Sequence, residues 1–324
     1  MSRILSGIQP SGKIHIGNYF GAIRQHIELQ SKHECFYFLA NLHALTTTRD
    51  KELLEQYSVD LTLDYLALGL DPNKATLFVQ SEIPEHTELA WIFATICSPG
   101  LLDRAHAWKD AVTKKKKDPT VGLYTYPLLM AADILLYEPD LVPVGQDQKQ
   151  HIEIARDLAQ KFNDTYKLEV FKLPEPMIKE EVAIIPGTDG QKMSKSYNNT
   201  IEIFADEAKV KKSIMGIVTD SKGVEDKKDP KSCNVFQLYQ LFATATETEN
   251  LRDKYLAGGF GYGDAKKTLL EKFYQYFGES REKRVALKSD LDYVREVLKN
   301  GSVKAQEQAK LVMHKVKAAT GLKF

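Results

Sequence analysis

The sequence predicts an α/β protein: a doubly wound parallel, Rossmann-like sheet over residues 1–200, followed by an all-helical part over residues 201–324. In the first part, short apolar runs alternate with amphipathic helical patterns, as expected of βαβ units. Residues 35–40 are almost continuously apolar, which is typical of a central parallel strand covered on both faces. Beyond residue 206 no β-rich run occurs, so helices are expected to the end of the chain.

A first strand carrying Ile4 and Leu5 leads into a turn rich in glycine and proline, residues 7–18. Tyr19, Ile23 and Ile27 then recur at helical spacing. Glycines let the backbone approach a ligand closely, and the amides at the start of the following helix form an anion site. The spacing matches neither the dinucleotide fingerprint nor a Walker loop. We therefore predict a different kind of phosphate-handling, nucleotide-binding turn.

The next elements continue the βαβ pattern. Residues 50–68 predict a helix that Asp50 caps, and its inward side chains are expected to be Leu53, Leu54, Tyr57, Leu61 and Tyr65. A strand over 76–80 and a helix over 88–97 follow. His43 lies just past the end of the strand at 35–40, where open parallel sheets bind ligands. The residues alone leave open whether His43 lines a pocket or is a structural histidine.

Tyr126, Met130 and Asp133 are spaced i, i+4 and i+7, which places them on one face of a helix. Their surroundings are apolar, and a lone carboxylate is costly there unless something pairs with it. Asp133 could face solvent or cap a neighbouring helix. We favour the alternative that it accepts a hydrogen bond from a ligand N–H in a pocket of aromatic size.

A short strand over 141–144 and a helix from Gly145 to about Phe162 come next. An irregular segment with Pro174 and Pro176 leads to a strand over 182–185, and then to a second motif, residues 192–196. Its two lysines flank small hydroxyl residues, and each ammonium is a compact charge that can follow the oxygens of a triphosphate. The turn-rich approach, residues 186–190, predicts a mobile loop.

Helices are predicted over 206–216, 234–245, 247–257, 264–277, 282–299 and 302–318. Their basic clusters, taken as a set, suit an RNA contact, although each one alone is typical of a solvated helix face. The clusters comprise Lys209, Lys211, Lys212, Lys227, Lys228, Lys304, Lys310, Lys315 and Lys317. The run from Lys114 to Lys117 predicts either a solvated segment or a flexible basic loop near the site.

Composition limits the remaining possibilities. Lysine plus arginine number 44, equal to aspartate plus glutamate, so any RNA contact must come from local basic patches. Cys35, Cys97 and Cys233 are scattered, as expected of reduced cysteines in the cytoplasm, and we predict no structural metal. No signal segment and no run long enough for a membrane span is found. We therefore expect a cytoplasmic protein without membrane contact.

Together, the His-Ile-Gly-Asn turn at residues 15–18 and the Lys-Met-Ser-Lys-Ser motif at 192–196 resemble the two signatures of class I aminoacyl-tRNA synthetases. Residues 7–22, 126–137 and 142–151 are similar to the tryptophanyl branch in particular. The resemblance implies activation of L-tryptophan by ATP to tryptophanyl-adenylate. Transfer to tRNA(Trp) would follow, releasing AMP and diphosphate, with Mg²⁺ as the phosphate counter-ion and a homodimer as the assembly.

The resemblance also implies domains and roles. Residues 1–200 would be the catalytic domain, with a connecting insertion at about 98–125. Residues 201–324 would bind the tRNA anticodon, and the last helix could pack back on the catalytic domain. Catalytic roles fall on His15, Asn18, Lys192 and Lys195. ATP contacts fall on Gln9, Pro10, Ser11, Gly17, Asn18, Gly145, Gln146, Asp147, Ala183, Lys192, Met193, Ser194, Lys195 and Ser196. Tryptophan contacts fall on Leu5, Gln9, His43, Tyr126, Met130, Asp133, Val142, Val144 and Gln148.

Two positions depart from the general patterns. Gln146 stands where the family usually has glutamate, and Asn18 replaces the second histidine of the class I signature, as it does in this branch. Three alternatives remain open: a tyrosyl-tRNA synthetase, a synthetase paralogue that binds tRNA or ATP without aminoacylating, and a small-molecule nucleotidylyltransferase. The last would not explain the helical tail.

Overall fold

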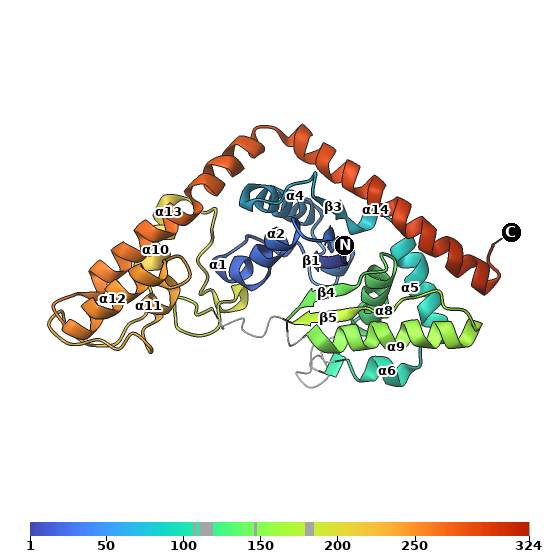
Figure 1. The fold of residues 1–324 in the computed structure, drawn as a ribbon, viewed down its shortest axis with the longest axis horizontal. Coiled ribbons are helices and arrows are strands. Elements are labelled where there is room, and N and C mark those ends of the chain that lie inside the picture. Colours follow the sequence, from blue (N-terminus) through green and yellow to red (C-terminus); the bar gives the residue numbers. More distant parts are fainter. Residues whose placement is uncertain (106–107, 110–118, 146–147, 179–184, 324) are drawn as a thin grey trace.

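The structure, a computed structural model, describes residues 1–105, 108–109, 119–145, 148–178 and 185–323. Its strands form one five-stranded parallel sheet in the order β3-β2-β1-β4-β5, seen near the centre of Figure 1. The strands are β1 (Arg3–Ile8), β2 (Glu34–Leu39), β3 (Ala75–Val79), β4 (Leu141–Val144) and β5 (Glu175–Ile178). The chain winds from β1 through β2 to β3, then returns to the other side of β1 for β4 and β5. The predicted doubly wound parallel sheet with a helical C-terminal part is confirmed.

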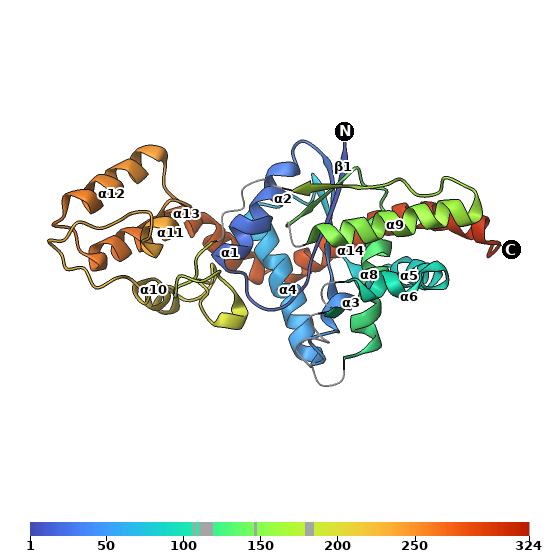
Figure 2. The ribbon, with the colours of Figure 1, turned by 90° about the horizontal axis from the view of Figure 1, so that it is seen from below.

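Helices precede, connect and follow the strands. The first half of the chain contains α1 (Ile16–Asn18), the π-helix η1 (Tyr19–Ile23), α2 (Arg24–Leu29), α3 (Asn41–Ala44), α4 (Lys51–Leu68), the 3-10 helix η2 (Gln80–Glu82), α5 (Glu85–Ile96), α6 (Pro99–Asp103), α8 (Val121–Leu135) and α9 (Lys149–Tyr166). The second half contains the 3-10 helix η4 (Lys195–Tyr197), α10 (Glu207–Met215), α11 (Asn234–Tyr239), α12 (Ala245–Ala257), α13 (Tyr262–Lys288) and α14 (Leu291–Thr320). Figure 2 shows α10–α13 as a lobe beside the sheet.

Both faces of the sheet are buried, which explains why β2 is apolar at nearly every position. Successive side chains of a strand point to opposite faces. Cys35 and Tyr37 belong to a core that includes α4 and the helical lobe. Phe36 and Phe38 belong to a second core with α5, α8, α9 and α14.

Helix α4 begins and ends as its sequence predicts, but its inward face was only partly predicted. Asp50 accepts a hydrogen bond from the Leu53 N–H (2.9 Å), and Gly69 ends the helix in the left-handed conformation (φ 116°). The expectation that Leu53 points inward is wrong, because this side chain is exposed. From Leu61 to Leu68 every residue is buried, since the sheet core covers one side and α14 covers another.

The segment with Pro174 and Pro176 is not irregular throughout, as the sequence suggested. Residues 175–178 form β5, which pairs with β4 along its length. Proline lacks the N–H that a ladder needs, and β5 tolerates it because it is an edge strand. Of the strand predicted over 182–185, residues 182–184 lie outside the described residues.

The sequence predicted three helices over the last part of the chain, 264–277, 282–299 and 302–318, but the structure has two long helices there, α13 and α14. The predicted breaks near residues 278–281 and 300–301 are wrong: the chain turns instead at Ser289, and Asp290 caps α14 by accepting from the Tyr293 N–H (3.1 Å). Helix α14 then runs from the helical lobe over β3 to α5 (Figure 1). Residues 305–316 of α14 contribute buried side chains to the core that contains Phe36 and Phe38.

Of the predicted basic clusters, only Lys228 contradicts the expectation of a solvated helix face, because its side chain is buried. Lys315 pairs with Glu138 and Lys317 with Glu88, both at 2.8 Å. Lys228 is buried, and its ammonium donates to the carbonyls of a turn, including Gly223 at 2.8 Å. The buried Lys228 therefore holds a turn of the fold, while Lys315 and Lys317 form ion pairs at the surface.

Among the described residues, no helix is both long enough and apolar enough to cross a membrane.

Gly301 is required where α14 crosses β3. A Cβ atom added there would lie 1.8 Å from the Leu77 carbonyl oxygen, which belongs to rigid strand backbone. We expect Gly301→Ala to destabilise the fold by about 1–3 kcal/mol, because α14 must move off the sheet. Thermal unfolding followed by circular dichroism measures the effect.

The matched control is Gly278→Ala in the middle of α13, where an added Cβ meets nothing within 4 Å. It should be neutral or stabilise by about 0.5–1 kcal/mol, since alanine favours a helix over glycine. Equal melting temperatures for the two variants would contradict the close approach of α14 to β3.

Candidate active site

A cavity of about 330 Å³ opens at the carboxyl edge of the sheet between β1 and β4. This is the point at which the strand order reverses, where open α/β sheets bind their ligands. Its walls come from β1, β2, β4 and the helices α3, α8 and α9. The lining residues are Leu5, Ser6, Gly7, Gln9, Phe38, Ala40, His43, Thr46, Leu123, Tyr126, Met130, Asp133, Ile134, Val142, Pro143, Val144, Gln148 and His151.

The structure brings together every residue that the sequence predicted for the tryptophan pocket. All of them line this one cavity. His151 was not predicted as a site residue; its Nε2 lies 2.5 Å from the Tyr126 hydroxyl. His151 lies three residues after Gln148, at the start of α9, and residues three apart share a helix face, so this spacing could have predicted His151 as a site residue.

Asp133 forms the floor of the cavity. It is fully buried, so the alternative in which it faces solvent is wrong. Its Oδ2 lies 2.7 Å from His43 Nε2, while its Oδ1 accepts from Gln80 Nε2 (2.7 Å) and lies 2.6 Å from His86 Nδ1. Burial alone would raise the pKa of Asp133, but the electrostatic interactions and hydrogen bonds with His43 and His86 outweigh it and lower the pKa to about 2.

Residues 7–18, here called the signature loop, lead from β1 to α1. Gly12 adopts a positive φ (107°), which L-residues rarely tolerate, and so allows the turn. The Asn18 side-chain oxygen accepts from the His15 N–H (3.2 Å), fixing the start of α1. His15 is buried, and its Nδ1 has no hydrogen-bond partner among the described residues. Burial, with a smaller effect of the nearby Lys195 charge, lowers the pKa of His15 to about 4, so the ring is neutral at pH 7.

Residues 186–199, here called the flap, carry the two lysines. Asn199 holds the flap together from a buried position: its Nδ2 donates to Asp189 (2.7 Å) and to the Lys192 carbonyl (3.1 Å), and its Oδ1 accepts from the Ser194 N–H (2.8 Å). The sequence did not mark Asn199 as a site residue. Met193 is buried in the core and its N–H donates to the Ile185 carbonyl (2.9 Å), so its side chain anchors the flap.

The flap meets the signature loop. Lys195 Nζ donates to the Ser11 carbonyl (3.2 Å) and lies near Gly12. Although much of the side chain is exposed, desolvation of its ammonium lowers the pKa of Lys195. Just past the flap, the Ile16 N–H donates to Ile201 (3.0 Å) and the Ile203 N–H to Ile14 (3.1 Å). Two segments far apart in the sequence therefore meet, and the signature loop also contributes Gly7 and Gln9 to the lining of the cavity.

The remaining predicted positions are less informative. Gly145 is exposed at the end of β4, and its carbonyl accepts from the Gln148 N–H (2.9 Å). Lys192 and Ser196 are exposed on the flap. Gln146, Asp147 and Ala183, together with the lysines at 114–117, lie outside the described residues.

Comparison with known proteins decides the family. The family described as "tRNA synthetases class I (W and Y)" matches residues 1–278. This chain belongs to that family. The predicted resemblance to class I synthetases of the tryptophanyl branch is confirmed by the relatives described next.

The synthetase is 53% identical over 322 residues to the tryptophan–tRNA ligase of Fusobacterium nucleatum subsp. nucleatum, covering 99% of this chain and 98% of that protein. It is 54% identical over 323 residues to the tryptophan–tRNA ligase of Rhodopirellula baltica, covering 99% and 100%. Its fold matches the crystal structure of the Campylobacter jejuni tryptophanyl-tRNA synthetase complexed with ADP and tryptophan, with a TM-score of 0.94, 47% identity, and coverage of 98% and 99%.

In this synthetase, helix α13 of the helical lobe holds the segment that leaves the flap. Arg281 donates to the carbonyls of Ile203 and Ala205. One turn further, Arg284 pairs with Asp60 and Asp64 of α4. The flap exit is therefore fixed between the signature loop on one side and α13 on the other.

Asn199→Ala should loosen the flap of the synthetase, because three internal hydrogen bonds are lost and buried partners are left unsatisfied. We expect adenylate formation to fall by about 10- to 100-fold as Lys195 loses its position, with little change in tryptophan affinity. Amino-acid-dependent pyrophosphate exchange and equilibrium binding of tryptophan measure the two effects.

Tyr197→Ala is the matched control, since this side chain lies in the same flap but is exposed. An Asn199→Ala variant that exchanges pyrophosphate at the wild-type rate would show that the Asn199 hydrogen bonds do not position the flap.

Proposed function

We propose that this synthetase activates L-tryptophan with ATP and transfers it to tRNA(Trp), releasing AMP and diphosphate. The observation that carries the proposal is the cavity itself. It is largely apolar, has a buried carboxylate at its floor, and is lined in part by Gly7 and Gln9 of the signature loop, whose Ser11 carbonyl accepts from Lys195 of the flap. The full-length identity to tryptophan–tRNA ligases supports the choice of amino acid.

The pocket suits an indole ring. Leu5, Met130 and Val142 supply apolar walls, and Asp133 is the acceptor for the indole N–H. Phenylalanine offers no N–H donor and would leave this carboxylate without a hydrogen bond from the ligand. Sites of this kind favour the correct amino acid by a factor of about 10⁴–10⁵ in kcat/KM. Tyrosine carries its hydroxyl at a different depth and misses Asp133. The remaining proposed tryptophan contacts come from Gln9, His43, Tyr126, Val144 and Gln148.

ATP is proposed to lie along the signature loop. Gln9, Pro10 and Ser11 would face the adenosine, and His15, Gly17 and Asn18 the phosphates. The neutral His15 ring and its free Nδ1 leave a hydrogen-bonding atom for this purpose. On the other side of the phosphates, Lys192, Ser194, Lys195 and Ser196 of the flap would contact the leaving pyrophosphate. Gly145 would approach the nucleotide through its backbone.

The reaction then depends on positioning and charge. The tryptophan carboxylate attacks the α-phosphorus, the bond to the β-phosphate oxygen breaks, and pyrophosphate leaves. In the second step a terminal ribose hydroxyl of the tRNA takes the acyl group and AMP is released. Phosphoryl chemistry of this kind is accelerated mainly by alignment and by stabilising the developing charge, which is the role proposed for His15 and Lys195.

Mg²⁺ is proposed as the counter-ion of the ATP phosphates. Among the described residues, no group of three or more histidine, cysteine, aspartate or glutamate side chains is placed to hold a metal ion. The donors around the signature loop are instead cations and amides, which fit a phosphate chain that brings its own hydrated ion. Mg²⁺ would neutralise phosphate charge while Lys195 follows the leaving group.

The assembly is also a proposal. Residues 201–324 would contact the tRNA anticodon through the lobe of α10–α13, and residues 1–200 would form the catalytic domain. Trp91 on α5 and Val121 on α8 are both strongly exposed apolar side chains. These two helices pack against each other near the proposed connecting insertion at 98–125, which favours a homodimer contact there. A cytoplasmic location agrees with the use of tRNA as substrate.

Pyrophosphate exchange measured separately with each of the common amino acids tests the proposal. We expect exchange with tryptophan alone. Exchange with tyrosine and none with tryptophan would identify a tyrosyl-tRNA synthetase. Charging of a tRNA(Trp) transcript then tests the second step, and exchange without charging would favour a paralogue that does not aminoacylate.

Lys195→Ala should lower the rate of adenylate formation by about 10²–10³-fold, because it removes a cation that acts mainly on the developing charge. Tryptophan affinity should not change. Single-turnover adenylate formation and tryptophan binding report the two quantities. Lys211→Ala, an exposed lysine on α10, should leave both unchanged. Equal losses of rate and of tryptophan affinity in Lys195→Ala would argue against a transition-state role.

A further inference from the structure

Behind the cavity floor lies a buried group of polar side chains that the sequence did not mark. Gln80, His86 and Tyr137 are fully buried, as is Asp133, which the first two contact. Gln80 Nε2 lies 2.7 Å and His86 Nδ1 2.6 Å from Asp133 Oδ1, and His86 Nε2 lies 2.9 Å from the Tyr137 hydroxyl. The rings of Phe38, Phe78 and Tyr137 surround the imidazole. None of the three polar residues lines the cavity.

The hydrogen-bond directions follow from chemistry. An ionised carboxylate only accepts, so His86 Nδ1 carries a proton and donates to Asp133. In the tautomer with its proton on Nδ1, Nε2 is an acceptor, and the Tyr137 O–H donates to it. The orientation of the Gln80 amide is fixed as well, because its Oε1 accepts from the Leu42 N–H (3.0 Å), which leaves its Nε2 for Asp133.

These contacts divide the two oxygens of Asp133 between the protein and the cavity. Oδ1 accepts from both Gln80 and His86, which uses its two lone pairs. Oδ2 accepts from His43, a cavity residue, and keeps one lone pair. Given the contacts of the described residues, this is the one position left for a donor in the cavity, and the buried contacts on Oδ1 fix the direction in which it points.

The contacts also bear on the charge of Asp133. A fully buried carboxylate without donors would take up a proton. A protonated Asp133 would offer an O–H and compete with a ligand donor. With His43, Gln80 and His86 in place, the carboxylate is ionised and has acceptor capacity to spare.

We propose that Gln80 and His86 are positioning residues that orient the Asp133 carboxylate, so that one lone pair of Oδ2 is offered to a heterocyclic N–H of the substrate. Tyr137 fixes the tautomer of His86 that this arrangement requires. The inference rests on the proposed function and deepens it, since it assigns discrimination for an N–H donor to residues that never touch the substrate.

The test compares tryptophan with β-(3-benzothienyl)alanine, a near-isostere in which sulfur replaces the indole N–H. The preference is the ratio of kcat/KM for the two amino acids in pyrophosphate exchange. We expect His86→Leu and Gln80→Met to reduce the preference by about 10- to 100-fold each, the effect of losing a hydrogen bond to a charged group. The KM for ATP should stay as in the wild type, which a general loss of structure would not allow.

Milder variants keep the test decisive if His86→Leu does not fold. His86→Asn retains a donor and should preserve the preference to within a few fold. Tyr137→Phe removes only the hydroxyl and should lower the preference by a few fold. Its matched control is Tyr65→Phe, another buried tyrosine, whose hydroxyl lies 3.0 Å from His26 on the opposite face of the sheet and should leave the preference unchanged.

The outcomes separate the inference from the function on which it rests. Folded Gln80→Met and Tyr137→Phe variants with the wild-type preference would overturn the inference and leave the proposed function standing. A wild-type protein that shows no exchange with tryptophan would overturn both. A reduced preference in Tyr65→Phe, equal to that in Tyr137→Phe, would mean that loss of any buried hydroxyl perturbs the pocket, and would also overturn the inference.

Discussion

The arrangement of the site depends on a short backbone ladder between residues 14–16 of the signature loop and residues 201–203 just beyond the flap. Ile16 donates to Ile201 and Ile203 to Ile14, at 3.0 and 3.1 Å. Backbone hydrogen bonds fix register as well as distance, so Lys195 is held within reach of Ser11. Arg281 of α13 takes the next carbonyls along the same segment. The position of the flap is therefore determined from two sides.

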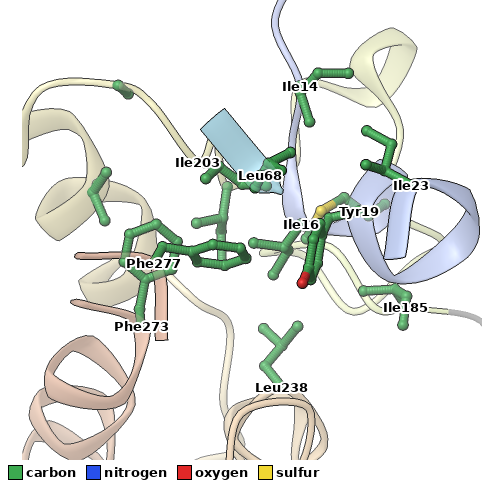
Figure 3. Close-up of a cluster of buried hydrophobic side chains, with 14 of the residues drawn as sticks. Ile14, Ile16, Tyr19, Ile23, Leu68, Ile185, Ile203, Leu238, Phe273 and Phe277 are labelled. Atoms are coloured by element: carbon green, nitrogen blue, oxygen red, sulfur yellow. The ribbon is translucent and has the colours of Figure 1, made fainter. Parts of the chain in front are cut away.

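A shared core supports this ladder. Ile16 and Tyr19, one and four residues after the signature histidine, belong to the same buried cluster as Phe273 and Phe277 of α13. Figure 3 shows these side chains gathered between the signature loop and the helical lobe, and the Tyr19 and Phe277 rings lie 5.1 Å apart, edge to face. The helical lobe thus helps to form the environment of the signature loop. We infer that displacement of α13 would disturb both the loop and the flap exit.

Local rules predicted most of the fold and part of the proposed tryptophan pocket, and the resemblance to the family implied the rest of that pocket. Strand ends converge at one edge of a parallel sheet, and Tyr126, Met130 and Asp133 share a helix face. Asn199 and His86 were missed because their importance lies in contacts with residues distant in the chain. Gly301 was misread as a helix break because glycine at a close approach has the same local appearance as glycine at a helix end.

Two buried aspartates have different partners, which agrees with a structural role for Asp64 and with the proposed binding role for Asp133. Asp64 Oδ1 accepts from Nε of Arg284, while Nη2 of the same guanidinium donates to Asp60 (2.7 Å), so this rigid, always charged group joins two carboxylates of α4 and ties α13 to α4. Within the described part of the chain, the hydrogen-bond partners of Asp133 are an amide and two imidazoles, each donating a single hydrogen bond, and include no arginine. A guanidinium at that floor could occupy both oxygens and leave nothing for a ligand. Single donors stabilise the charge and still leave one lone pair facing the cavity, which is the condition for recognising an N–H.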